Sequence, residues 1–95
     1  MSTTINQYIE ELHFRMLNPD FDLNTELDYV FDTFDEQQEI TDRMLALDAT
    51  INMGIDVKST QADKERVKKS SRIIYRRLKK IDKQLGDLLI QHQDK

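Results

Sequence analysis

Residues 67–88 read VKKSSRIIYRRLKKIDKQLGDL, and an apolar or small side chain recurs in this stretch every three or four positions. The recurring positions are Val67, Ser71, Ile74, Leu78, Ile81, Leu85 and Leu88. Such spacing over three heptads puts the side chains in one line along a helix, as in coiled-coil-like pairs. Thr60 is a suitable N-cap, because Asp63 follows three residues later. The stretch therefore predicts one helix over residues 60–92.

The segment before it predicts a second long helix, over residues 23–53. Asp22 and Asn24 are both good N-caps, and Gly54 is a suitable residue to end the helix. Its apolar positions, spaced by threes, fours or their sums, are Leu23, Leu27, Val30, Phe34, Met44 and Ile51. Gln37 and Thr41 interrupt this line near the polar run at residues 35–39. That run indicates either a kink or a polar layer, and the sequence leaves both open.

The first helix is predicted over residues 4–17. Thr4 and Gln7 fit a capping box, in which each side chain accepts a hydrogen bond from the other residue's backbone N–H. Apolar residues then follow at helical spacing. Pro19 favours a helix end just before it, because the residue before a proline is disfavoured in the helical conformation.

Together these segments predict an all-α chain: a single domain of residues 1–95, with a short N-terminal helix and a long antiparallel, coiled-coil-like hairpin. The apolar stripe of the 23–53 helix is too wide for one partner helix. We therefore expect a homo-oligomeric helical bundle in which a second chain covers the flanks of this stripe. The flanking residues are Phe31, Ile40, Leu45 and Leu47.

Composition limits the cellular setting that we expect. Cysteine is absent, so disulfides and thiolate chemistry are excluded, and a reducing compartment is compatible. No apolar run is long enough for a membrane span, and the N-terminus lacks a signal-peptide pattern. We expect a small soluble cytoplasmic protein that does not contact membranes.

Patterns that would indicate catalysis or metal binding are incomplete. Glu10 and His13 have the Glu-x-x-His spacing of di-iron bundles, but no second such motif exists. Asp20 opens a calcium-loop pattern that fails at its sixth and twelfth positions, Thr25 and Phe31. A glycine-rich phosphate loop is also missing. We therefore expect no enzyme activity, no catalytic residues, no metal and no cofactor.

The distribution of charge is the feature most informative about function. Residues 1–57 carry 13 acidic and two basic residues, a net charge of −11, whereas residues 58–95 carry 12 basic and five acidic ones, a net charge of +7. The candidate interaction face consists of basic residues expected to point away from the hairpin: Arg66, Lys69, Arg72, Arg76, Lys79, Lys80 and Lys83. This pattern favours a non-enzymatic protein–protein interaction or regulatory module. The alternative is a nucleic-acid or nucleotide-binding protein that uses the same face.

Overall fold

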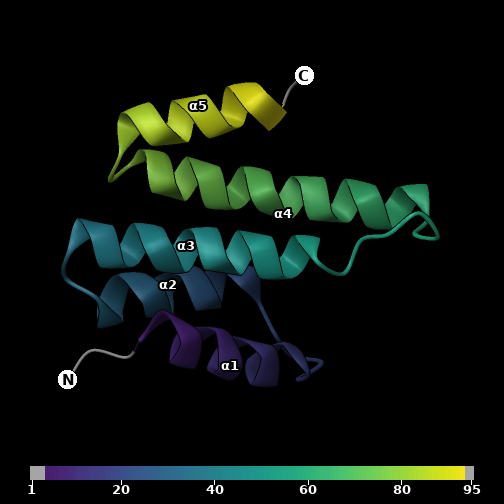
Figure 1. Ribbon diagram of the computed structural model, residues 1–95, viewed down its shortest axis with the longest axis horizontal. Helices are drawn as coiled ribbons and strands as arrows, with labels where there is room; N and C mark the ends of the chain where they lie inside the picture. The colour runs from purple at the N-terminus through teal and green to yellow at the C-terminus, as the bar shows by residue number, and fades with distance from the viewer. Residues whose placement is uncertain (1–3, 94–95) are drawn as a thin grey trace. The chain divides into compact units, whose positions relative to one another are not determined.

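The computed structural model describes residues 4–93, and this part of the chain is all-helical, with five helices and no strand (Figure 1). The helices are α1 (Ile5–Met16), α2 (Leu23–Thr33), α3 (Gln37–Asn52), α4 (Gln61–Lys79) and α5 (Lys83–Gln93). The predicted all-α fold class is confirmed. None of these described helices combines the length and the apolar character that a membrane crossing requires.

Capping boxes begin α1 and α4 at the threonines that the sequence indicates. The Thr4 hydroxyl accepts the Gln7 backbone N–H at 3.2 Å, and the Gln7 side chain accepts the Thr4 N–H at 3.1 Å. Thr60 and Asp63 make the same reciprocal pair at 3.1 and 3.4 Å. Each pair satisfies two backbone donors that a helix leaves without intrahelical partners.

The predicted continuous helix over residues 23–53 is wrong, because the chain breaks between α2 and α3. Phe34 is in an extended conformation (φ −114°, ψ 135°) that ends α2, and its side chain is buried. The Arg43 guanidinium, on α3, lies 4.4 Å from the centre of the Phe34 ring. Asp35 and Glu36 fall just before α3, where the positive end of a helix favours negative charge. The polar run is therefore a break between two helices.

The predicted helix over residues 60–92 is also wrong, because the chain turns at residues 80–82. The Ile81 N–H donates to the Leu78 carbonyl at 3.0 Å as α4 ends. The Asp82 carboxylate then accepts the Leu85 backbone N–H at 3.1 Å, as a capping residue does at the start of a helix. The longest described helix, α4, has 19 residues. The described helices are therefore shorter than predicted, and the long coiled-coil-like hairpin is not confirmed.

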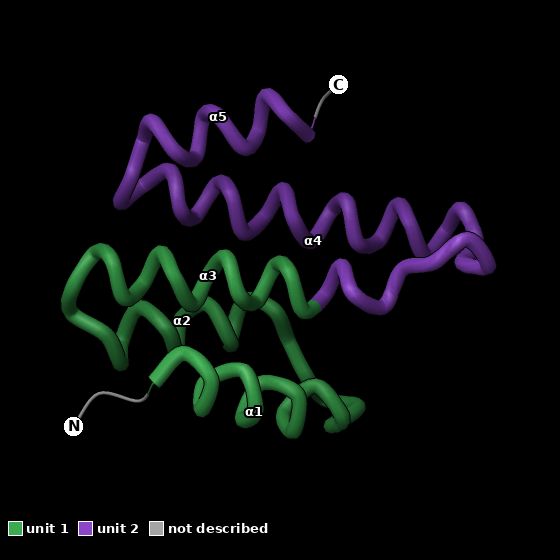
Figure 2. Tube along the Cα trace, in the orientation of Figure 1, with its two compact units in different colours: residues 1–50 green, residues 51–95 purple. Residues whose placement is uncertain are grey.

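The chain divides into two compact units, residues 1–50 and 51–95, where the sequence predicts a single domain (Figure 2). Within the described residues, the buried apolar side chains of unit 1 are Tyr8, Leu12, Leu27, Val30, Phe34, Ile40, Met44 and Leu47. Those of unit 2 are Ile74 and Leu78. Burial of apolar side chains is thus concentrated in unit 1.

A buried ion pair links α1 to α2 inside unit 1. Arg15 donates two hydrogen bonds to the Glu26 carboxylate, at 2.7 and 2.8 Å, and the side chain of Glu26 is only 3% exposed. The Tyr8 hydroxyl donates a third, at 3.0 Å. The hydrogen bond to Glu26 raises the pKa of Arg15, and burial beside this carboxylate raises the pKa of Tyr8. Charge-assisted bidentate bonds of this kind fix the geometry of both partners.

Candidate functional site

Helix α4 carries most of the basic residues of the chain, and its sequence supports a helix at both ends. Asp63 lies in the first turn, where hydrogen bonds from Thr60 lower the pKa of its carboxyl. Arg76, Arg77 and Lys79 lie in the last turn, where the negative end of a helix favours cations. Ser71, Ile74 and Leu78 form its buried line, as the sequence predicts.

Helix α5 folds back and packs along α4, so one face of α4 is covered (Figure 1). The Lys79 ammonium pairs with the Asp87 carboxylate at 2.7 Å. Near the other end of α5, the Gln93 side-chain amide donates to the Lys68 carbonyl at 2.6 Å. Gly86 permits the approach, because a Cβ added there would lie 2.6 Å from the Lys79 Cα.

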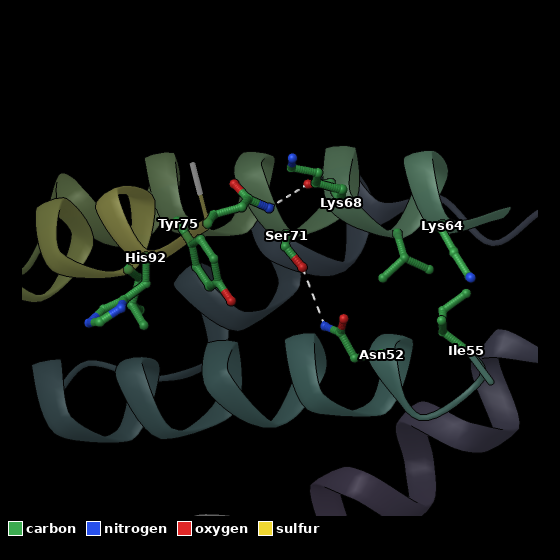
Figure 3. A pocket seen from close by; sticks show the side chains of 10 residues that line it. Asn52, Ile55, Lys64, Lys68, Ser71, Tyr75 and His92 are labelled. Carbon is green, nitrogen blue, oxygen red and sulfur yellow. Dashed lines mark hydrogen bonds between the residues drawn. The ribbon is translucent and has the colours of Figure 1, made fainter. Parts of the chain in front are cut away.

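An open groove of about 400 Å³ lies within unit 2, along α4, between the last residues of α3 and the end of α5 (Figure 3). We call it the basic groove. Its basic side chains are those of Lys64 and Lys68, and His92 adds an imidazole. Hydrogen-bonding groups come from Asn52, Ser71, Tyr75 and Gln93, and half-buried apolar side chains from Ile55, Val67 and Leu89.

Figure 3 shows how the polar groups are spread along the basic groove. Lys64 lies at one end near Ile55, and His92 lies at the other end beside Tyr75. Between them the Asn52 side-chain amide donates to the Ser71 hydroxyl at 3.3 Å. From residue 64 to residue 75, α4 rises about 16 Å at 1.5 Å per residue. The groove therefore has the length of an extended peptide of four or five residues.

The polar groups of the groove are suited to hydrogen bonding with an anion. Ammonium and hydroxyl groups donate hydrogen bonds to carboxylate or phosphate oxygens. The half-buried Val67 and Leu89 offer apolar surface to the uncharged part of the same ligand. Within residues 4–93, no three His, Asp or Glu side chains come together as a metal site would require. The arrangement fits an anionic ligand that also has an apolar part.

The predicted basic face lies outside this groove. Arg66 pairs with Asp63 at 3.2 Å, and Lys79 is engaged by Asp87. Lys69 and Arg72 line a separate small hollow with Glu65 and Lys68. Arg76, Lys80 and Lys83 are exposed. The turn at residues 80–82 reverses the chain, so the seven predicted residues do not form one continuous helical face.

The predictions from the sequence do not include the groove: they place Val67 and Ser71 in the buried line of the helix and assign no role to the other lining residues. One signal for the groove exists in the sequence. Lys64, Lys68, Ser71 and Tyr75 are spaced by four, three and four residues, which places them on one face of a helix. The apolar line of Val67, Ser71, Ile74 and Leu78 overlaps this face at Ser71. His92 and Leu89 join this face only because α5 folds back, and no local pattern indicates that contact.

The predicted oligomer contacts occupy two kinds of environment. Ile40 and Leu47 are buried in the single chain, 7% and 0% exposed, so they offer little surface to a second one. Phe31 and Leu45 are half-buried. Ile40 and Leu47 therefore give no support to self-association, and the oligomeric state stays a prediction.

Comparison of the chain with protein-family models, with curated proteins and with solved structures found no match.

Proposed function

We propose that this chain is a non-enzymatic protein-interaction module whose basic groove binds an acidic segment of a partner protein. The observation that carries the proposal is the combination, in one groove, of Lys64 and Lys68 with the half-buried Val67 and Leu89. An acidic segment with an aliphatic or aromatic anchor would satisfy both kinds of surface. Apolar contact supplies affinity and charge complementarity supplies selectivity.

The net charge of unit 2 supports this choice of ligand. Residues 51–95 carry 12 Lys or Arg and six Asp or Glu, a net charge of +6, so an acidic segment is attracted before contact. The ammonium groups of Lys64 and Lys68 belong to exposed residues and are accessible to such a segment. An interaction module of this kind needs no cofactor, and a regulatory role in the cytoplasm remains a prediction.

The test uses a labelled 14-residue peptide of leucine and glutamate, with anisotropy as the readout. We expect binding that Lys64→Gln/Lys68→Gln weakens about tenfold. The matched control is Lys80→Gln/Lys83→Gln, which removes the same charge outside the groove and should change affinity less than twofold. Equal losses in both double variants would show that the peptide responds only to net charge, and would contradict the groove as its site.

The alternative function, nucleic-acid binding, has support from the exposed Lys69 and Arg76 on α4. Labelled DNA and RNA 20-mers, titrated at 50 and 200 mM salt, separate the two proposals. Phosphate contacts release counterions, so nucleic-acid affinity falls steeply as salt rises. Sub-micromolar binding that drops at least tenfold with salt and disappears in Lys69→Glu/Arg76→Glu would replace the protein-binding proposal.

Self-association is a further part of the proposal, since Phe31 and Leu45 keep some exposed apolar surface. Light scattering at micromolar concentration gives the mass directly. A value above 11.3 kDa that falls in Phe31→Ser/Leu45→Ser supports an oligomer built on these residues. A monomer mass in the unmodified chain would contradict it.

A further inference from the structure

Two large apolar side chains are exposed at the C-terminal end of α1, in unit 1: Phe14 lies in the last turn, and Leu17 is the C-cap residue that follows it. Phe14 is 78% exposed and Leu17 is 81% exposed. They are three residues apart, so they lie on neighbouring positions of the helix surface. Single exposed apolar residues are common, but an adjacent pair beside a cleft is typical of a contact surface.

The cleft next to them has a volume of about 360 Å³ and an aromatic lining. Phe14, Phe21 and Tyr29 contribute rings from α1, from the connecting segment and from α2. We call it the aromatic cleft. The connecting segment is held by local hydrogen bonds, from the Phe21 N–H to the Asn18 carbonyl at 3.0 Å and from the Asp20 N–H to the Asn18 side chain at 2.9 Å. The cleft is thus formed within unit 1.

The charges around the aromatic cleft are mainly negative. Asp20, Asp22 and Glu26 line it, and Arg15 is the cation among its lining residues. Arg15 is already bound by Glu26 through two hydrogen bonds. The Asp22 carboxylate caps α2 through hydrogen bonds from Thr25, at 2.9 and 3.0 Å, and neither Asp22 nor the exposed Asp20 is paired with Arg15. Both carboxylates therefore contribute negative charge that attracts a positively charged ligand. Residues 1–50 as a whole carry 12 Asp or Glu and two Arg, a net charge of −10.

The aromatic rings are themselves compatible with a cation. The Arg15 guanidinium lies 4.8 Å from the centre of the Tyr29 ring, a distance at which a ring attracts a cation. A lysine or arginine side chain of a ligand that enters the cleft beside Arg15 would meet the ring of Phe14 or Phe21, with a carboxylate nearby. The aliphatic stem of such a side chain also packs well on aromatic surface.

From this charge complementarity we propose that the aromatic cleft is a second docking site, for a basic amphipathic segment of a partner protein. An aliphatic or aromatic residue of the segment contacts Phe14 and Leu17, and its Lys or Arg side chains face Asp20 and Asp22. The ligand chemistry is the opposite of that proposed for the basic groove. One chain then contacts a basic segment through unit 1 and an acidic one through unit 2, as an adaptor does.

The probe for this site is a labelled 14-residue amphipathic peptide of leucine and lysine. We expect Phe14→Ala/Leu17→Ala to weaken its binding at least tenfold. The matched control, Met53→Ala/Val57→Ala, also removes two exposed apolar side chains, which are 77% and 94% exposed. It should leave affinity unchanged. Thermal melts of both variants verify folding, because none of these four side chains is buried.

Charge is tested by Asp20→Asn against Asp35→Asn, two exposed positions of unit 1 of which only Asp20 lines the cleft. We expect a threefold or larger loss of affinity for the first and none for the second. Equal losses would show attraction to net charge alone and would overturn the proposal. Unchanged binding in Phe14→Ala/Leu17→Ala would also overturn it.

Two further outcomes bear on the occupant. If light scattering shows a dimer that Phe14→Ala/Leu17→Ala dissociates, the cleft is covered by a second copy, and docking of another protein is overturned. Binding of the leucine–glutamate peptide should be unaffected in every unit 1 variant. If the leucine–glutamate peptide still binds while the leucine–lysine peptide does not, only the aromatic cleft proposal fails. If the leucine–lysine peptide binds and the leucine–glutamate peptide does not, only the basic groove proposal fails.

Discussion

Units 1 and 2 differ in how many apolar side chains they bury and in how closely their helix backbones approach. In unit 1 eight buried apolar residues are accompanied by Glu26, whose carboxylate receives Arg15 and Tyr8. In unit 2 the described residues include two buried apolar side chains, and α5 reaches α4 through the close backbone approach at Gly86. The ion pair of unit 2 between Lys79 and Asp87 is about half exposed.

This difference indicates where each unit tolerates substitution. A unit held by buried side chains loses stability when one buried group loses its partner or its volume. A unit whose helices approach closely at a glycine also loses stability when an added atom prevents that approach. Exposed charges contribute little in either unit, because water and salt screen them.

The largest loss in the free energy of unfolding is expected from Leu78→Asp in unit 2, because this unit has few other buried apolar side chains among its described residues. Leu78 is 0% exposed, so the variant loses apolar burial and buries a carboxylate without a partner, at a cost of at least about 4 kcal/mol. Urea denaturation followed by circular dichroism measures it. Leu88→Asp is the control: this position of the same predicted line is 50% exposed, so little change is expected. Equal destabilisation would favour the continuous helix over the turn at residues 80–82.

Breaking the buried ion pair of unit 1 is expected to cause the second-largest loss of stability. Arg15→Met leaves the Glu26 carboxylate buried without its cation, and we expect a loss of about 3 kcal/mol in the free energy of unfolding. Arg15→Met/Glu26→Met should lose less, since no charge then stays buried. Arg66→Met breaks an exposed ion pair of unit 2 and should leave the urea midpoint unchanged. A large shift of the urea midpoint in Arg66→Met would contradict the expected difference between the buried ion pair of unit 1 and the exposed one of unit 2.

Gly86→Ala tests the close approach of α5 to α4. Its Cβ would meet the Lys79 Cα at 2.6 Å, so the helices must separate, at a cost of about 1–3 kcal/mol. Gly54→Ala is the matched control, because the nearest atom, the Ile51 carbonyl oxygen, lies at 3.7 Å. It should be neutral or slightly stabilising. Hydrogen exchange of α5 amides should speed up in the first variant and not in the second.

The smallest effect concerns the Tyr8 hydroxyl in unit 1. Tyr8→Phe removes one hydrogen bond to Glu26, with an expected loss of about 1–2 kcal/mol. Because the pKa of Tyr8 is raised above 10.0 in the folded state, its contribution is present below pH 10 and is lost as pH rises above it. The stability difference between the unmodified chain and Tyr8→Phe should therefore narrow at alkaline pH.

The sequence by itself determined the local features of this protein. Thr4, Thr60 and Asp22 cap helices where their side chains reach backbone N–H groups three residues away, an interaction set within one turn. The periodicity of Ser71, Ile74 and Leu78 likewise predicts their buried line. The opposite charges of the two halves are a property of composition alone. Each of these depends on neighbouring residues, so no tertiary information is needed.

The tertiary structure decided the helix breaks and both candidate sites. The apolar residues keep the same spacing through residues 80–82 whether or not the chain turns there. Their spacing therefore does not distinguish one long helix from two shorter helices that pack together. The backbone approach at Gly86 settles it, since that contact joins residues on different helices. In the same way Arg15 finds Glu26 eleven residues away, and His92 joins Lys64 and Tyr75 in one groove. Such contacts depend on how helices pack, and packing is a non-local balance of burial, volume and charge.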